Sequence, residues 1–144
     1  MTQQPILGSL GKPQPKPPKE LHPLQLAYVG DALYELYVRN HLLQKGIRKT
    51  QELQKEAIAY VSAVAQAESC HRIFPLLNEE EQEVIKKGRN AKSGRSPKSA
   101  TVTEYRYSTG IEALFGYLYL EQREARIQEL MKVILEAIDK ERSS

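Results

Sequence analysis

Residues 24–44 read LQLAYVGDALYELYVRNHLLQ, and this stretch decides the fold. Apolar side chains would lie on nearly every side of a helix drawn through it. Pro23 suits the first turn of such a helix, and Gly46 suits the position just past its end. A helix that is apolar all round is expected at the centre of a core or at a subunit interface. The sequence therefore predicts a long buried helix here.

Capping signals frame the other helices. Thr50 and Asn78 are predicted N-caps, and Thr101 with Glu104 has the spacing of a capping box. No stretch shows the alternation of a strand, so we predict an all-α fold of about six helices. The remaining ranges are 50–60, 62–77, 78–87, 101–121 and 124–140, and a basic loop is expected from Gly88 to about Ala100.

The prolines divide the chain unevenly. Six of the eight lie in the first 23 residues, where large apolar residues are few. We predict a flexible, Pro-rich arm over residues 1–20 and one folded domain over residues 21–144. A chain of 144 residues suits one domain of ordinary size.

Composition narrows the setting of the protein. No apolar run approaches the roughly 20 residues that a membrane span needs. The N-terminus lacks a basic stretch followed by an apolar one, so no secretory signal is expected. A single cysteine, Cys70, suits a reducing compartment, and we predict a cytoplasmic protein without a membrane partner.

Two acids interrupt the most apolar segments. Asp31 lies inside the first predicted helix, and Glu112 lies inside the helix expected over 101–121. Burying an ionised carboxylate is costly unless it is paired or bound to a metal. If the helices cross near Gly30 and Gly116, the two acids converge and favour a hard cation such as Mg²⁺. The alternative is that each acid pairs with an arginine or points to solvent.

Other site chemistry is less favoured by the sequence. Glu35 lies one turn after Asp31, where it either joins a cation site or pairs with Arg39. The three histidines lack the spacing of zinc ligands, and no nucleotide-binding loop or nucleophile motif occurs. We therefore expect no small-molecule cofactor.

The net charge is concentrated in one segment. Residues 84–106 hold seven basic residues against one acid, a net +6, so the rest of the chain carries −3 of the total +3. Basic side chains among Gly and Ser suit contacts with a phosphate backbone, although a solvated loop is the alternative. The seven are Lys86, Lys87, Arg89, Lys92, Arg95, Lys98 and Arg106.

Two motifs resemble those of a known family. Residues 26–35, LAYVGDALYE, resemble the signature of the ribonuclease III catalytic domain, and residues 112–120, EALFGYLYL, resemble its second acidic motif. The runs RNAK (89–92) and YRYSTG (105–110) are similar to the compact bacterial subfamily, Mini-ribonuclease III. The resemblance covers about residues 20–140.

This resemblance implies the fold of the ribonuclease III catalytic domain and a homodimer. It also implies an endoribonuclease that hydrolyses double-stranded RNA with Mg²⁺, with Mn²⁺ able to substitute, and leaves 5′-phosphate ends. By position, Asp31 and Glu112 match the catalytic, metal-binding acids, and Asn90 joins the seven basic residues as an RNA contact. Maturation of the precursor of large-subunit (23S) ribosomal RNA is the suggested task.

The chain departs from the larger family members in three ways. Ala27 and Thr109 stand where those members have two further acids, and no double-stranded-RNA-binding domain is expected after the catalytic domain. A catalytically inactive RNA-binding module is therefore the alternative function. A helical dimer that binds another protein through its Pro-rich arm is a third hypothesis.

Overall fold

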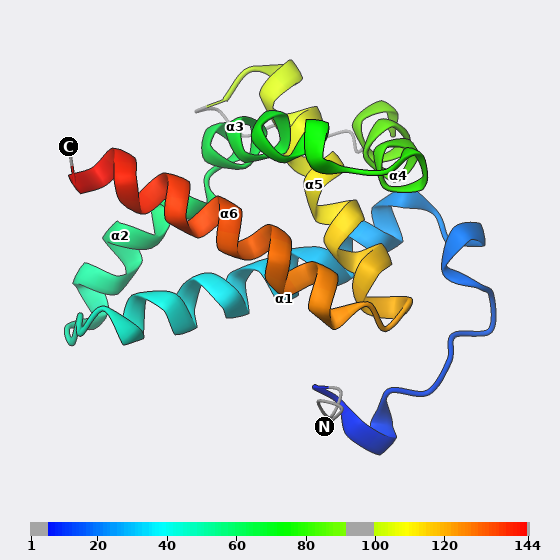
Figure 1. Ribbon diagram of the computed structural model, residues 1–144, viewed down its shortest axis with the longest axis horizontal. Coiled ribbons are helices and arrows are strands. Elements are labelled where there is room, and N and C mark those ends of the chain that lie inside the picture. The colour runs from blue at the N-terminus through cyan, green and yellow to red at the C-terminus, as the bar shows by residue number, and fades with distance from the viewer. Residues whose placement is uncertain (1–5, 92–99, 144) are drawn as a thin grey trace.

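The computed structural model describes residues 6–91 and 100–143, and it is all-α, as predicted (Figure 1). No strand occurs among these residues. The described residues form six α-helices and three short 3₁₀ helices. The α-helices are α1 (Pro23–Gln44), α2 (Thr50–Val61), α3 (Ala63–Ile73), α4 (Glu79–Asn90), α5 (Val102–Leu120) and α6 (Glu124–Ser143); the 3₁₀ helices are η1 (Gly8–Leu10), η2 (Pro18–Glu20) and η3 (Phe74–Leu76).

The two apolar helices α1 and α5 cross in direct backbone contact. A Cβ atom added at Gly30 would lie 1.7 Å from the carbonyl oxygen of Glu112. A Cβ atom added at Gly116 would lie 1.8 Å from the carbonyl oxygen of Leu26. Only glycine permits this approach, so the predicted crossing near Gly30 and Gly116 is confirmed.

The helix at the centre of the core is α5 rather than α1. Every residue from Ser108 to Leu118 is buried except Glu112. Helices α1, α3 and α4 pack around it, and α6 packs against α3 and α5 (Figure 1). Along α1, by contrast, the apolar side chains divide between the core and an outer face that solvent reaches. Even so, no helix in the described part of the chain is long and apolar enough to cross a membrane.

Two of the three predicted N-caps are confirmed. Asn78 and Thr101 each form a capping box with the glutamate three residues later. The prediction for Thr50 is wrong, because Lys49 is the N-cap of α2 and Thr50 is the first helical residue. The Lys49 side chain provides no cap hydrogen bond, so α2 begins without the capping that the sequence suggested.

The predicted end of the fourth helix is also wrong, since α4 continues through Asn90. Gly88 was expected to begin the loop. A Cβ atom at this position would lie 2.9 Å from the Cα atom of Gly110. Gly88 therefore lies inside α4, where it allows close packing against α5, and it does not end the helix.

The described part of the N-terminal segment passes along the outside of the helices (Figure 1). The Ile6 amide donates a hydrogen bond to Oε1 of Glu124 at 3.3 Å, and Lys19 Nζ lies 3.8 Å from Oε1 of Glu80. Both contacts are exposed and therefore contribute little to stability. The flexibility of the arm and the domain boundary at residue 20 stay predictions.

Candidate active site

The crossing of α1 and α5 brings Asp31 and Glu112 together. Gly30, which lies against the backbone of Glu112, is the residue before Asp31. The side chains of the two acids are within hydrogen-bonding range of each other. The juxtaposition therefore follows from the glycine contact, because no larger residue would let the two helices approach so closely.

Burial and the neighbouring acid act together on Glu112. Burial, and then the charge of Asp31, raise the pKa of Glu112 from its ordinary value of 4.5 to about 8. A hydrogen bond from Gln66 acts in the opposite direction. Without a cation, Glu112 therefore keeps its proton at neutral pH. A divalent cation between the carboxylates would offset both causes by supplying positive charge.

The two acids differ in their exposure to solvent. Asp31 is exposed, whereas Glu112 is partly buried where α1, α3 and α5 meet. A ligand from solvent would therefore meet Asp31 first, while the protein surrounds most of Glu112. Carboxylate oxygens are the ligands that Mg²⁺ and Mn²⁺ prefer, so the donor set fits a hard cation.

Two acids meet directly at this site, and the charge of a third, Glu35, also helps to raise the pKa of Glu112. Across residues 6–91 and 100–143, no group of three or more His, Cys, Asp or Glu side chains could hold a metal. Glu35 pairs with Arg39, whose Nε lies 3.0 Å from Glu35 Oε2, as one alternative predicted. The Thr109 hydroxyl donates to the carbonyl oxygen of Tyr105 at 3.1 Å, and Ala27 has no donor atom in its side chain. The ionisable part of the site is two carboxylates.

One residue of the site, Gln66 on α3, was not predicted from the sequence. Its side chain is only 4% exposed, and its Nε2 donates to Glu112 Oε2 at 3.4 Å. A signal was present in the sequence. Gln66 lies four residues before the buried Cys70, so it occupies the apolar face of α3 and breaks the pattern as Asp31 and Glu112 do.

The cysteine and the histidines have structural surroundings. Burial raises the pKa of the Cys70 thiol to about 12, which keeps it protonated and unreactive. His22 caps α1, His41 pairs with Asp139 at 2.9 Å, and the His71 ring lies 4.3 Å from the Tyr107 ring, centroid to centroid. None of these groups is part of the acidic pair.

Five predicted RNA contacts lie in the described part of the chain. Lys86, Lys87, Asn90 and Arg106 are exposed, and Arg89 is half-buried, 5.7 Å from the centre of the Tyr107 ring. The other three, Lys92, Arg95 and Lys98, lie outside the described residues.

The basic end of α4 lies close to the acidic pair along α5. Gly88 contacts Gly110, which precedes Glu112 by two residues. This separation is about 3 Å of helix rise. The basic end of α4 therefore packs against the part of α5 that carries Glu112.

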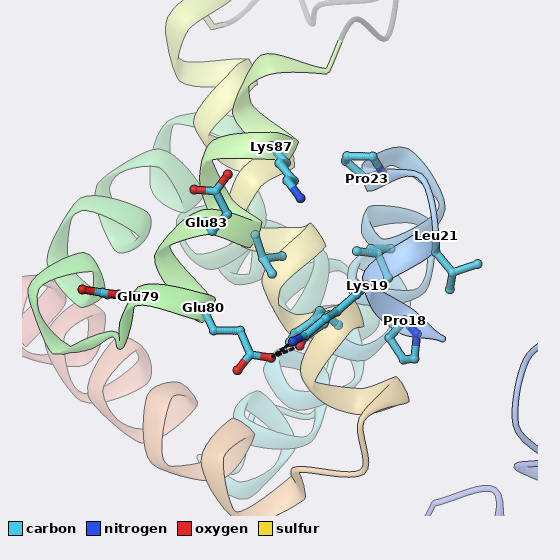
Figure 2. A pocket seen from close by; sticks show the side chains of 11 residues that line it. Pro18, Lys19, Leu21, Pro23, Glu79, Glu80, Glu83 and Lys87 are labelled. Carbon is cyan, nitrogen blue, oxygen red and sulfur yellow. Dashed lines mark hydrogen bonds and ion pairs between the residues drawn. The ribbon is translucent and has the colours of Figure 1, made fainter. Parts of the chain in front are cut away.

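A separate cavity of about 480 Å³ lies between η2, the start of α1 and α4. Figure 2 shows Glu80 and Lys19 facing each other across it, with Lys87 and Glu83 further along α4. Neither Asp31 nor Glu112 lines this cavity. We therefore assign the candidate active site to the acidic pair, where two carboxyl groups meet and the pKa of the more buried one is raised, rather than to this cavity.

Comparisons with known proteins found a matching family model and similar sequences. A family model described as "Ribonuclease III domain" matches residues 24–123. A "Mini-ribonuclease 3" from Symbiobacterium thermophilum is 47% identical over 123 residues, which cover 85% of this chain and 95% of the relative. Another from Brevibacillus brevis is 50% identical over 115 residues, covering 80% and 86%.

A solved structure is also similar. The crystal structure of a protein from Fusobacterium nucleatum matches with a TM-score of 0.75 and 33% sequence identity. The match covers 83% of this chain and 95% of that one. The likeness therefore extends from the sequence to the arrangement of the helices.

Proposed function

We propose that Asp31 and Glu112 are the catalytic metal ligands of this chain, which belongs to the ribonuclease III family. It is a divalent-metal-dependent endoribonuclease of double-stranded RNA, and it resembles Mini-ribonuclease III. The proposed ion is Mg²⁺, with Mn²⁺ able to substitute. One observation carries this proposal: two carboxyl groups meet at a glycine crossing, and the pKa of the buried one is raised to about 8. An added cation relieves that unfavourable arrangement.

Each residue has a distinct task in the proposed reaction. When bound, Mg²⁺ supplies Lewis-acid activation of water and neutralises charge on the scissile phosphate. Asp31 offers its carboxylate from the exposed side, where the phosphate arrives. Glu112 holds the inner side, where partial burial strengthens electrostatic interactions. The proposed products are a 5′-phosphate and a 3′-hydroxyl end.

We also propose a homodimer that uses the outer face of α1. Three apolar side chains on this face are exposed: Tyr28 is 83% exposed, Leu43 60% and Leu36 51%. Exposed apolar side chains that share one helix face are typical of interaction sites. A second copy of the chain would remove this surface from water and would present two acidic pairs to one RNA duplex.

The basic segment, residues 84–106, is the proposed RNA-binding surface. A-form RNA is recognised mainly by its shape and phosphates, and cationic side chains near the acidic pair suit that mode. The proposed contacts are Lys86, Lys87, Arg89, Asn90, Lys92, Arg95, Lys98 and Arg106. From the resemblance to Mini-ribonuclease III we infer that the substrate is the precursor of 23S ribosomal RNA, which places the protein in the cytoplasm.

Cleavage of a long RNA duplex in Mg²⁺ tests the proposed site. We expect Asp31→Asn and Glu112→Gln to lower the rate at least 100-fold, since each removes a metal ligand, while both variants still bind the duplex. Glu68→Gln is the matched control, because Glu68 is an exposed acid on α3 and its loss should leave the rate within twofold. Equal cleavage by all four proteins would refute the assignment.

The second candidate function, RNA binding without catalysis, rests on Ala27 and Thr109. Neither supplies a carboxylate, so the site has two acids where larger family members have four. Under this alternative the unaltered protein would bind the duplex in a salt-sensitive manner and leave it intact in Mg²⁺ and in Mn²⁺. The same cleavage assay therefore separates the two functions.

A further inference from the structure

Helix α3 places buried polar side chains beneath the acidic pair. Gln66 and Ser69, three residues apart on the same face of α3, are each 4% exposed. The hydroxyl of Tyr34, a fully buried residue of α1, lies beside Ser69 and within electrostatic range of Glu112. Together with Glu112, these three side chains make four polar groups, contributed by α1, α3 and α5, in surroundings that are otherwise apolar.

Gln66 is the member of this group that contacts a proposed metal ligand. Burying a primary amide costs free energy that hydrogen bonding must offset. The Gln66 amide nitrogen donates to Oε2 of Glu112 at 3.4 Å, which leaves Oε1 for another partner. Because an amide group carries no charge, this contact holds the carboxylate without adding a third negative charge beside Asp31.

The packing of α3 against α5 fixes the position from which Gln66 donates to Glu112. Gln66 lies one turn before Cys70, which is 1% exposed, so its backbone is fixed by the core. Glutamate at position 112 has several rotamers available on a helix, and only some of them point toward Asp31. A donor at a fixed place selects among those rotamers.

We propose that Gln66 is a positioning residue, which holds the Glu112 carboxylate toward Asp31 and so presets the separation of the two metal ligands. This inference rests on the proposed function, because it assumes that the two acids bind the ion. Gln66 itself does not touch the reacting atoms in this account. It lowers the reorganisation that ion binding would otherwise require.

Titration of the intact protein with Mn²⁺, followed by calorimetry, tests the proposal without reference to cleavage. Gln66→Met keeps the approximate volume of the side chain but removes the donor. We expect Mn²⁺ affinity to fall about 10- to 100-fold, the usual effect of losing a hydrogen bond to a metal ligand. Gln66→Asn, whose amide is one methylene too short to reach Glu112, should show the same loss and guards against a folding defect in the first variant.

A cleavage measurement adds a second readout. For Gln66→Met, a higher Mg²⁺ concentration should restore kcat, because the ligands remain and only their positioning is lost. Gln51→Leu, at an exposed glutamine of α2, is the control and should behave as the unaltered protein does.

The variants separate the proposed function of Asp31 and Glu112 from the proposed role of Gln66. If Asp31→Asn and Glu112→Gln bind Mn²⁺ as the unaltered protein does, the proposed function fails. If those two lose the ion while Gln66→Met and Gln66→Asn keep full affinity, only the role of Gln66 fails. Weakened binding by both Gln66 variants, with rescue by high Mg²⁺, supports the proposal.

Discussion

Asp31, Glu112 and Gln66 share one property: each is a polar side chain on a helix that is otherwise largely apolar where it lies. Asp31 and Glu112 could be singled out because a carboxylate is costly in an apolar helix. Gln66 escaped notice because glutamine is common on exposed helix faces, and only the packing of α3 shows that this one is 4% exposed. A charged residue within an apolar helix segment can be recognised from the sequence alone. A neutral polar residue such as glutamine becomes informative only when its burial is known.

The raised pKa of Glu112 predicts a stability effect with a definite sign. The unfolded chain ionises this group from about pH 4.5, whereas the folded protein keeps the proton until about pH 8. The folded state therefore binds more protons in this window, and its stability falls as pH rises. Glu112→Gln removes the penalty and should raise Tm by roughly 5 °C at pH 7.5 without metal.

Thermal unfolding in chelator at pH 5 and pH 7.5 checks this effect. The gain in Tm from Glu112→Gln should shrink at pH 5, where the unfolded chain also holds the proton. Saturating Mg²⁺ should abolish or reverse the gain, because the unaltered protein then gains binding free energy that the variant lacks. A gain that grows as pH falls would contradict the raised pKa.

At the scale of elements, local signals predicted all six helices. They misplaced the N-cap of α2 and the ends of α3 and α4, since α3 stops at Ile73 and α4 continues through Asn90. Asn78 and Thr101 form the expected capping boxes because that motif needs only residues three apart. Gly88 was misread because a glycine at a helix end and a glycine at a helix contact look alike in a sequence. The neighbour that decides between them is Gly110, which is 22 positions away.

The crossing of α1 and α5 predicts an effect of Gly30→Ala. The added methyl group would lie 1.7 Å from the Glu112 carbonyl oxygen, so the helices must separate. We expect a loss of about 3 kcal/mol or more in the free energy of unfolding, measured by denaturant titration. Cleavage by the fraction that stays folded should also fall, because the separation of Asp31 and Glu112 changes.

Ala32→Gly is the control for helix propensity at a neighbouring exposed position of α1. It should cost about 1 kcal/mol and leave cleavage unchanged. If Gly30→Ala were no more destabilising than this control, the close approach of the two helices would not be needed for the fold.

For the whole molecule, the sequence predicted where charge collects but not how it relates to the acids. The division into +6 over residues 84–106 and −3 elsewhere follows from counting. The contact of Gly88 with Gly110 joins the basic end of α4 to the helix that carries Glu112. That relation depends on tertiary packing, which no local pattern specifies.

The proposed RNA-binding surface predicts a change in salt dependence. Replacing Lys86 and Arg106 with alanine should lower the slope of log affinity against log salt by about 2, one for each lost phosphate contact. Duplex binding measured over a range of KCl concentrations gives this slope. At saturating RNA, kcat should remain unchanged, since neither residue touches the acidic pair. An unaltered slope would exclude both side chains as phosphate contacts.

The outer face of α1 predicts the assembly state. Leu36→Asp places a charge amid the exposed apolar side chains of this face and should convert the protein from dimer to monomer in sedimentation experiments. Leu76→Asp is the matched control, because Leu76 is similarly exposed at 53% but lies on η3. A dimer that survives Leu36→Asp and dissociates with Leu76→Asp would place the interface elsewhere.

The central claim is that Asp31 and Glu112 share one divalent cation. Anomalous diffraction from a crystal soaked in Mn²⁺ tests it most directly, because the signal locates the ion without reference to activity. The account predicts a peak within about 2.0–2.4 Å of an oxygen from each carboxylate. A crystal of active protein with its strongest Mn²⁺ peak elsewhere, and none between these two side chains, would contradict it.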